Sequence, residues 1–178
     1  AEMKNVAAPS TKLIPKGTRN RAKLIESREP MLEYLREYAY KSEIPPEHFA
    51  HMTDWLLQWR KRDAGMAFSL VLIDFRNPSE LGNVLGAKYA LELIKRVGNE
   101  IDNALRSTDL LCRTHVSSFW VLLPNGMPDM VLQKLEPILA AARQDGMDAT
   151  QLRIRKLLIP GDAAEGATAA DLFRQMQD

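Results

Sequence analysis

The sequence predicts an α+β fold, in which helices flank a central and mostly antiparallel sheet. Three observations lead to this fold class. The run Ala67–Phe75 is apolar and rich in strand-forming residues, and its length suits a buried central strand. Two further apolar segments, Leu110–Thr114 and Phe119–Leu123, are separated by a short polar turn, which is the pattern of an antiparallel hairpin. Between and around these strands, apolar residues recur at helical spacing.

The chain before the first strand has helical rather than strand patterns. Residues 1–17 are small, polar and interrupted by proline, so we expect a linker or arm there. Residues 29–40 carry apolar side chains at helical spacing, and Ile44-Pro45-Pro46 ends that helix and begins another. The second helix has one apolar stripe and three cations at its C-terminal end, where they favour the helix dipole. The stripe consists of Phe49, Met52, Leu56 and Trp59, and the cations are Arg60, Lys61 and Arg62.

The rest of the chain alternates between helices and strands. Pro78–Leu105 predicts two helical pieces with Gly86 between them, and Met130–Ala142 and Ala169–Met176 predict two more helices. Gln151–Ile159 alternates between apolar and polar residues, which predicts a further strand. The expected order from Ala67 onward is therefore strand, two helices, two strands, helix, strand and helix, without an internal repeat.

Composition limits the classes of protein to consider. The chain has 178 residues, 46% of them hydrophobic, which suits one ordinary domain with a real core and a short extension. A formal net charge of +1 provides no basic field, so we expect no nucleic-acid partner. The single cysteine, Cys112, excludes an internal disulfide and fits a reducing cytosol. Because no secretory signal or membrane-spanning run is present, we expect a cytoplasmic domain. The first residue is Ala, which is compatible with a piece of a longer, membrane-anchored parent.

One stretch of the chain carries the most specific signal. Arg106-x-x-Asp109 is followed after five residues by His115-Val-Ser-Ser-Phe119, and the apolar strand that comes next ends in Leu123-Pro124. This arrangement resembles the signature hairpin of the GGDEF (diguanylate cyclase) family, where Arg-x-x-Asp precedes Gly-Gly-Asp/Glu-Glu-Phe and a strand ending in Leu-Pro. The predicted order from Ala67 onward is also similar to that family's β-α-α-β-β-α-β core, a nucleotide-cyclase-like fold. The resemblance implies a linker at 1–17, an extra N-terminal helical pair within 18–64 and a degenerate GGDEF domain at 65–178.

The resemblance also implies that the catalytic residues are lost. In active cyclases two carboxylates hold two Mg²⁺ ions; Asp74 matches the first, whereas Ser117 stands in place of the second. A neutral hydroxyl is a poor ligand for a hard cation. His115 and Val116 replace glycines that let GTP approach the backbone, and Gly82 replaces the asparagine that reads guanine. We therefore expect no cyclase activity, no bound metal and no cofactor; the alternative role for Asp74 is to cap a turn.

The pair Arg106 and Asp109 is the part of the family's inhibitory, product-binding site (the I-site) that remains. In the family this pair binds cyclic di-GMP. Arginine can bond guanine or phosphate with two donors, and aspartate can accept from guanine N1 and N2. Arg143, on the following predicted helix, is a candidate for the second arginine that family members often add. A second interpretation stays open, in which Arg106 and Asp109 pair with each other or cap the preceding helix.

The function that the resemblance implies is that of a cyclic di-GMP receptor in bacterial signalling. Such a domain would act through another protein or domain, for example in the control of exopolysaccharide, biofilm, adhesion or motility. The alternative is a protein-interaction or dimerisation module that has lost nucleotide binding.

Two features of the helix before the first strand bear on this choice. Trp55 and Trp59 are expected either to pack in the core or to form a surface for a partner or a homodimer. His48 and His51 have a spacing that zinc can use, but no further Cys or His accompanies them, so we expect a packing or solvated role.

Overall fold

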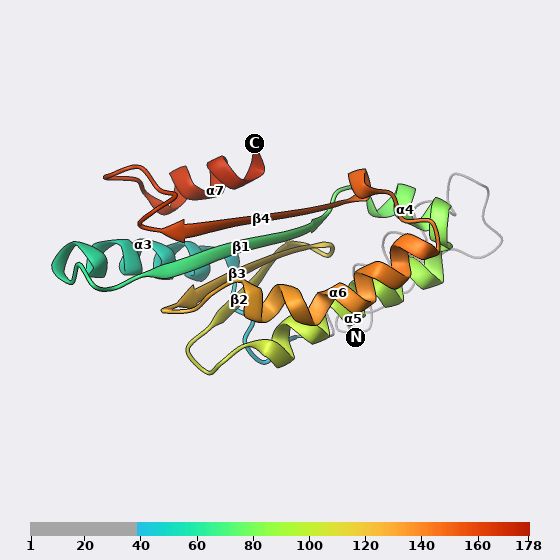
Figure 1. Cartoon of the computed structure of the whole chain (residues 1–178), viewed down its shortest axis with the longest axis horizontal. Coiled ribbons are helices and arrows are strands. Elements are labelled where there is room, and N and C mark those ends of the chain that lie inside the picture. The colour runs from blue at the N-terminus through green and yellow to red at the C-terminus, as the bar shows by residue number, and fades with distance from the viewer. Residues whose placement is uncertain (1–38) are drawn as a thin grey trace, which may run out of the picture. The chain divides into compact units, whose positions relative to one another are not determined.

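A four-stranded antiparallel sheet organises residues 39–178, which are the residues that the computed structural model describes (Figure 1). Its strands are β1 (Phe68–Phe75), β2 (Leu110–His115), β3 (Ser118–Pro124) and β4 (Leu152–Ile159). They lie in the order β2-β3-β1-β4, so β1 pairs with β3 along one edge and with β4 along the other. Because both of its edges are paired, β1 is buried along nearly its whole length.

Helices cover both faces of the sheet. They are α3 (Pro46–Arg62), α4 (Pro78–Leu85), α5 (Ala87–Ala104), α6 (Asp129–Gln144) and α7 (Ala169–Gln177), and a short 3-10 turn, η1 (Ala149–Gln151), precedes β4. On one face α3 and α7 share a core with the strands, where Phe49 and Leu172 pack with Leu70 and Trp120. On the other face α5 and α6 pack against each other, and Gly98 of α5 lies against the ring of Phe119. Figure 1 shows α3 and α7 on the opposite side of the sheet from the α5–α6 pair.

Local sequence explains where the helices between β1 and β2 begin and end. The Asn77 side chain accepts from the Glu80 N–H at 3.1 Å, and Pro78 occupies the first turn of α4, where its missing N–H costs nothing. Gly86 has a φ of 91°, a conformation that favours glycine, and it separates α4 from α5. The predicted division of this segment at Gly86 is therefore confirmed.

The predicted fold class is confirmed, and the predicted elements within residues 39–178 are present in the predicted order. Their ends differ by a residue or two, as expected from patterns alone. The arm at 1–17 and nearly all of the helix predicted at 29–40 lie outside the described residues. In the part of the chain that the structure describes, no helix is both long and apolar enough to cross a membrane.

The predicted boundary at residue 64 differs from the structure. The compact unit begins at Tyr40, so α3 belongs to it and is not a separate extension. Phe49 and Leu56 of α3 are 1% and 2% exposed, because they pack into the core beneath the sheet. The buried side of the predicted apolar stripe is therefore the contact that holds α3 to the domain.

Candidate ligand site and a degenerate metal site

Ser117 is buried in the turn between β2 and β3, and its side chain faces the end of β1. Its Oγ donates to the carbonyl oxygen of Phe75 at 3.1 Å, and its own carbonyl accepts from the Phe75 N–H at 2.9 Å. The residue is 3% exposed. The position at which the sequence lacks a metal-binding carboxylate therefore holds a hydroxyl that ties the hairpin to β1.

Asp74, the carboxylate at the end of β1, is engaged by side chains from both neighbouring strands. Ser118 Oγ donates to Asp74 Oδ1 from β3. Arg153 Nη2 donates to Asp74 Oδ2 from β4 at 3.2 Å. Both contacts follow from the register of the sheet, since Asp74 lies opposite Ser118 on one side and opposite Arg153 on the other. Directly opposite residues in an antiparallel sheet have their side chains close together on one face.

Arg153 places a positive charge beside Asp74, the carboxylate that the resemblance implies as a metal ligand in active cyclases. The side chains of Asp74 and Arg153 are 14% and 18% exposed, so this ion pair is largely shielded from water. Arg153 Nη1 also donates to the carbonyl of Gln177 at the end of α7, at 2.8 Å. A divalent cation at Asp74 would have to displace this guanidinium. Among residues 39–178 no group of three or more His, Cys, Asp and Glu side chains is arranged to hold a metal ion.

Arg106 and Asp109 form a pair in the loop between α5 and β2. Arg106 Nε and Nη2 donate to the two carboxylate oxygens of Asp109, at 3.2 and 3.1 Å. The Arg106 backbone N–H donates to Asp109 Oδ2 at 2.8 Å. Arg106 Nη2 also donates to the carbonyl of Pro124, at the end of β3, at 2.8 Å. The structure thus brings together the two residues that the sequence singled out, and it links them to the signature hairpin.

The two side chains of this pair differ in exposure. The side chain of Asp109 is 0% exposed, whereas that of Arg106 is 44% exposed. Both Asp109 oxygens already accept from Arg106, so this carboxylate is not open to a ligand in this conformation. Arg106 Nη1 has no hydrogen-bond partner within residues 39–178, and the residue as a whole is exposed. Arg106 is therefore the member of the pair that a ligand can reach.

Arg143 is not brought to this pair. It lies near the end of α6 and donates to Glu136 at 2.6 Å. Arg106 contacts Pro124, which precedes the start of α6, and Arg143 lies about 20 Å further along that helix at 1.5 Å per residue. The expectation that Arg143 adds to a ligand site at Arg106 is therefore not met within one chain, because helix length separates them.

The remaining candidates lie on α3 and in the hairpin turn. Trp55 and Trp59 are 48% and 44% exposed, so the interpretation that they pack in the core is wrong. His48 and His51 are exposed on the same helix, which agrees with a solvated role. His115 ends β2 and is also exposed.

Comparison with models of protein families shows which family the chain belongs to. Residues 47–156 match the family model described as "Diguanylate cyclase, GGDEF domain". The chain belongs to the GGDEF family. The matched region begins inside α3, which agrees with the packing of that helix in the domain. A search of curated proteins found no match.

Solved structures have the same fold as this GGDEF domain. The GGDEF domain of TpbB (also called YfiN) from Pseudomonas aeruginosa is 21% identical, with a TM-score of 0.55, over 79% of this chain and 83% of that chain. The GGDEF domain of DgcB from Caulobacter crescentus, solved in complex with c-di-GMP, is 13% identical, with a TM-score of 0.54, over 79% and 84%. The FimX GGDEF domain from Pseudomonas aeruginosa is 17% identical, with a TM-score of 0.54, over 79% and 88%.

Sequence patterns alone did not identify Arg153 as the partner of Asp74 in this GGDEF domain. Arg153 alternates with Ile154 and Arg155 in β4, which is an ordinary pattern for a strand with a polar face. Its contact with Asp74 depends on the pairing of β1 with β4 and on their register, which no local pattern gives. Arg153 could have been found only by combining two expectations: that its strand pairs with the strand ending at Asp74, and that an arginine there would lie near the carboxylate.

Proposed function

We propose that this GGDEF domain is catalytically inactive and acts as a cyclic di-GMP receptor in bacterial signalling. The contacts of Asp74 support the first part of the proposal, that the domain is catalytically inactive. Its two oxygens are bound by Ser118 and by the guanidinium of Arg153, and the second metal-binding position is the buried hydroxyl of Ser117. Two Mg²⁺ ions need several charged oxygen ligands in one place. The one carboxylate retained here is already neutralised by a cation of the chain itself.

The pair of Arg106 and Asp109 supports the second part of the proposal, that the domain binds cyclic di-GMP. Asp109 fixes the Arg106 side chain through Nε and Nη2, and the Nη1 end remains available. The Nη1 end of a guanidinium held in this way can donate to guanine O6 or N7, or to a phosphate, with little further loss of side-chain freedom. In this proposal Arg106 contacts the ligand and Asp109 positions it. The family membership of the chain and the c-di-GMP complex of the similar DgcB domain support this choice of ligand.

The alternative function is a protein-interaction module that has lost nucleotide binding. The closed geometry of the Arg106–Asp109 pair favours it, because a buried, fully bonded Asp109 has a structural role without any ligand. Two exposed tryptophans on α3 favour it as well. The exposed tryptophans by themselves do not exclude the receptor function, since the output of a receptor also requires contact with another protein or domain.

Two measurements on the purified chain test the proposal. Incubation with GTP and Mg²⁺ or Mn²⁺, followed by chromatography, should give no cyclic di-GMP. Calorimetric titration should give saturable heat with cyclic di-GMP and none with GTP at the same concentration. Product that increases with protein concentration would overturn the claim of inactivity. Binding of GTP in preference to cyclic di-GMP would overturn the receptor assignment.

A further inference from the structure

Trp55 and Trp59 form an exposed aromatic pair on the outer side of α3. Their ring centroids are 5.0 Å apart and their planes are inclined at 63°, an edge-to-face contact. The side chains of Phe49 and Leu56 face the core from the same helix, so the two indoles are not needed to hold α3 in place. Nearly half of each tryptophan is open to water. Large aromatic residues exposed together in this way are typical of interaction surfaces.

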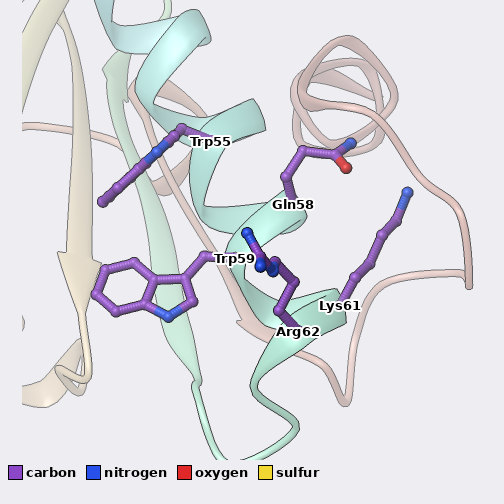
Figure 2. Close-up of a pocket in the computed structure, with 5 residues that line it drawn as sticks. All are labelled: Trp55, Gln58, Trp59, Lys61 and Arg62. Atoms are coloured by element: carbon purple, nitrogen blue, oxygen red, sulfur yellow. The ribbon is translucent and has the colours of Figure 1, made fainter.

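The indoles line a shallow groove, which we call the Trp groove. Its volume is about 450 Å³, and it is lined by Trp55, Gln58, Trp59, Lys61 and Arg62. Figure 2 shows both indoles extending to one side of α3, Gln58 and Lys61 to the other side, and Arg62 between them. An apolar surface therefore lies next to a cationic one within two turns of a helix.

The cations of the Trp groove are not neutralised within the described part of the chain. Neither Lys61 nor Arg62 forms an ion pair or a side-chain hydrogen bond within residues 39–178. The nearby carboxylates of α3 and its C-cap point elsewhere. Asp54 accepts from the Ala169 N–H at 2.8 Å, and Asp63 accepts from the Gly65 N–H at 3.0 Å. The positive charge beside the indoles is thus free to attract an anionic partner.

We propose that the Trp groove docks an acidic amphipathic helix of a partner protein. Apolar side chains of that helix would cover Trp55 and Trp59, and carboxylates one turn away would reach Lys61 and Arg62. An isolated helix of this kind folds as it lays its apolar face in a groove, and the charges select the partner and its orientation. None of the residues that line this groove belongs to the cyclic di-GMP site proposed at Arg106, and the groove gives the receptor a route of output.

Charge argues against the other occupants of the Trp groove. The segment 1–38 contains eight Lys and Arg residues and five Glu residues, so its net charge as a whole is positive; four of the Glu residues lie within 26–37, and a groove covered by that stretch would fail to bind the acidic peptide in the full chain. A second copy docked about a two-fold axis at the groove would bring the same cations of both copies together. Nucleic acid would require a wider basic surface than a chain of net charge +1 offers.

The test uses two labelled synthetic peptides of about 15 residues with the same leucines at helical spacing, one with Glu and one with Lys at all other positions. Fluorescence anisotropy with the full chain should give saturable binding of the acidic peptide and none of the basic one. Raising the salt concentration from about 0.05 to 0.5 M should lower the affinity for the acidic peptide by about tenfold, because salt screens the exposed charges.

Variants connect this binding to the Trp groove. The double substitution Lys61→Glu with Arg62→Glu and the single substitution Trp59→Ala should each lower affinity for the acidic peptide by at least about tenfold. Lys134→Glu and Val84→Ala are the matched controls, because Lys134 and Val84 are exposed on other helices. Circular dichroism checks folding, and calorimetry with cyclic di-GMP should give wild-type affinity for both groove variants. If the chain binds no cyclic di-GMP while peptide binding behaves as expected, the proposed function fails and the groove stands.

Three results would overturn the groove proposal. One is that the two peptides bind equally well, or that neither peptide binds at a concentration of about 1 mM. Another is wild-type affinity of the folded charge-reversal variant for the acidic peptide. The third is a concentration-dependent dimer in analytical ultracentrifugation that Trp59→Ala abolishes, since the groove would then hold a second copy of the chain.

Discussion

Arg153 lies directly across the sheet from Asp74, and its Nη2 is 3.2 Å from Asp74 Oδ2 at the end of β1. An active member of the family places a metal ion at this carboxylate. Here a positive charge from β4 stands beside that carboxylate, and in the proposed function it takes the place of the ion.

This ion pair should contribute to the stability of the domain. Arg153→Met should lower the free energy of unfolding by about 1–3 kcal/mol, because Asp74 would stay shielded from water without its cation. Arg155→Met is the matched control on the same strand, since Arg155 is exposed and, within residues 39–178, bonds only the carbonyl of Asp178, at 3.4 Å. Urea denaturation measures both variants. Adding Asp74→Asn to Arg153→Met should recover part of the loss, and an equal loss for the two arginine variants would contradict this role.

Restoring a carboxylate at Ser117 should not restore catalysis. Ser117→Asp would put a charged oxygen against the Phe75 carbonyl, which now accepts the buried Ser117 hydroxyl. We expect lower stability, by about 1–3 kcal/mol, and no cyclic di-GMP from GTP with Mg²⁺. Ser117→Asp combined with Arg153→Met should also be inactive, since the guanine and phosphate contacts are still missing. Chromatography of the products checks both variants, and turnover by either one would show that fewer losses separate this domain from a cyclase.

Cys112 should be unreactive in the native protein. Burial, with a smaller effect from Glu43, raises the pKa of its thiol from 9.0 to about 12, so the folded state keeps the thiol protonated at pH 8. A thiol-specific reagent should label one cysteine rapidly in denaturant and only slowly without it. Above pH 9 the unfolded thiol ionises while the folded one does not. The free energy of unfolding should therefore fall from pH 9 toward pH 12 more steeply in wild type than in Cys112→Ala. Rapid, complete labelling of folded protein at pH 8 would contradict the burial.

Gly126 should control the position of the Arg106 guanidinium. A Cβ added at Gly126 would lie 2.8 Å from Arg106 Nη2 and 2.9 Å from Leu123 Cβ. The first contact is relieved when the flexible arginine leaves the Pro124 carbonyl, whereas the second requires a small shift of the backbone at Gly126; circular dichroism checks that the variant is folded. If Arg106 binds cyclic di-GMP as proposed, Gly126→Ala should weaken binding by about tenfold, the value of roughly one hydrogen bond. Gly161→Ala is the control, because its Cβ would meet nothing closer than 3.7 Å. Unchanged calorimetric affinity in Gly126→Ala would argue against a ligand at Arg106.

Local patterns predicted the elements of this domain because each has its own signal. The apolar run of β1, the hairpin of β2 and β3, and the glycine between α4 and α5 are all visible over short windows. Side-chain contacts between segments far apart in the sequence could not be predicted from these local patterns. The Asp74–Arg153 pair joins residues 79 positions apart, and Arg113 on β2 bonds Glu43 at 2.9 Å across 70 positions.

The sequence patterns also did not predict how exposed individual side chains are to solvent. The spacing of Trp59 with Phe49 and Leu56 placed it in one stripe, yet only Phe49 and Leu56 are buried. A period of 3.6 residues gives the direction of a side chain but not the width of the surface that covers it. The same limit applies to Asp109, whose register with the hairpin was predicted but whose complete burial was not.

Calorimetric titration with cyclic di-GMP of wild type, Arg106→Ala, Arg106→Lys and Arg143→Ala tests the central claim most directly. Arg106→Ala should bind about ten- to a hundredfold more weakly than wild type, because a charge-assisted contact contributes about 1.5–3 kcal/mol. Arg106→Lys should recover little, since an ammonium lacks the planar fork by which Asp109 holds the side chain while Nη1 donates to the ligand, and Arg143→Ala should bind like wild type. Circular dichroism confirms that each variant is folded. Wild type without heat at about 100 μM ligand, or folded Arg106→Ala with wild-type affinity, would contradict the receptor function and leave the Arg106–Asp109 pair as a structural feature.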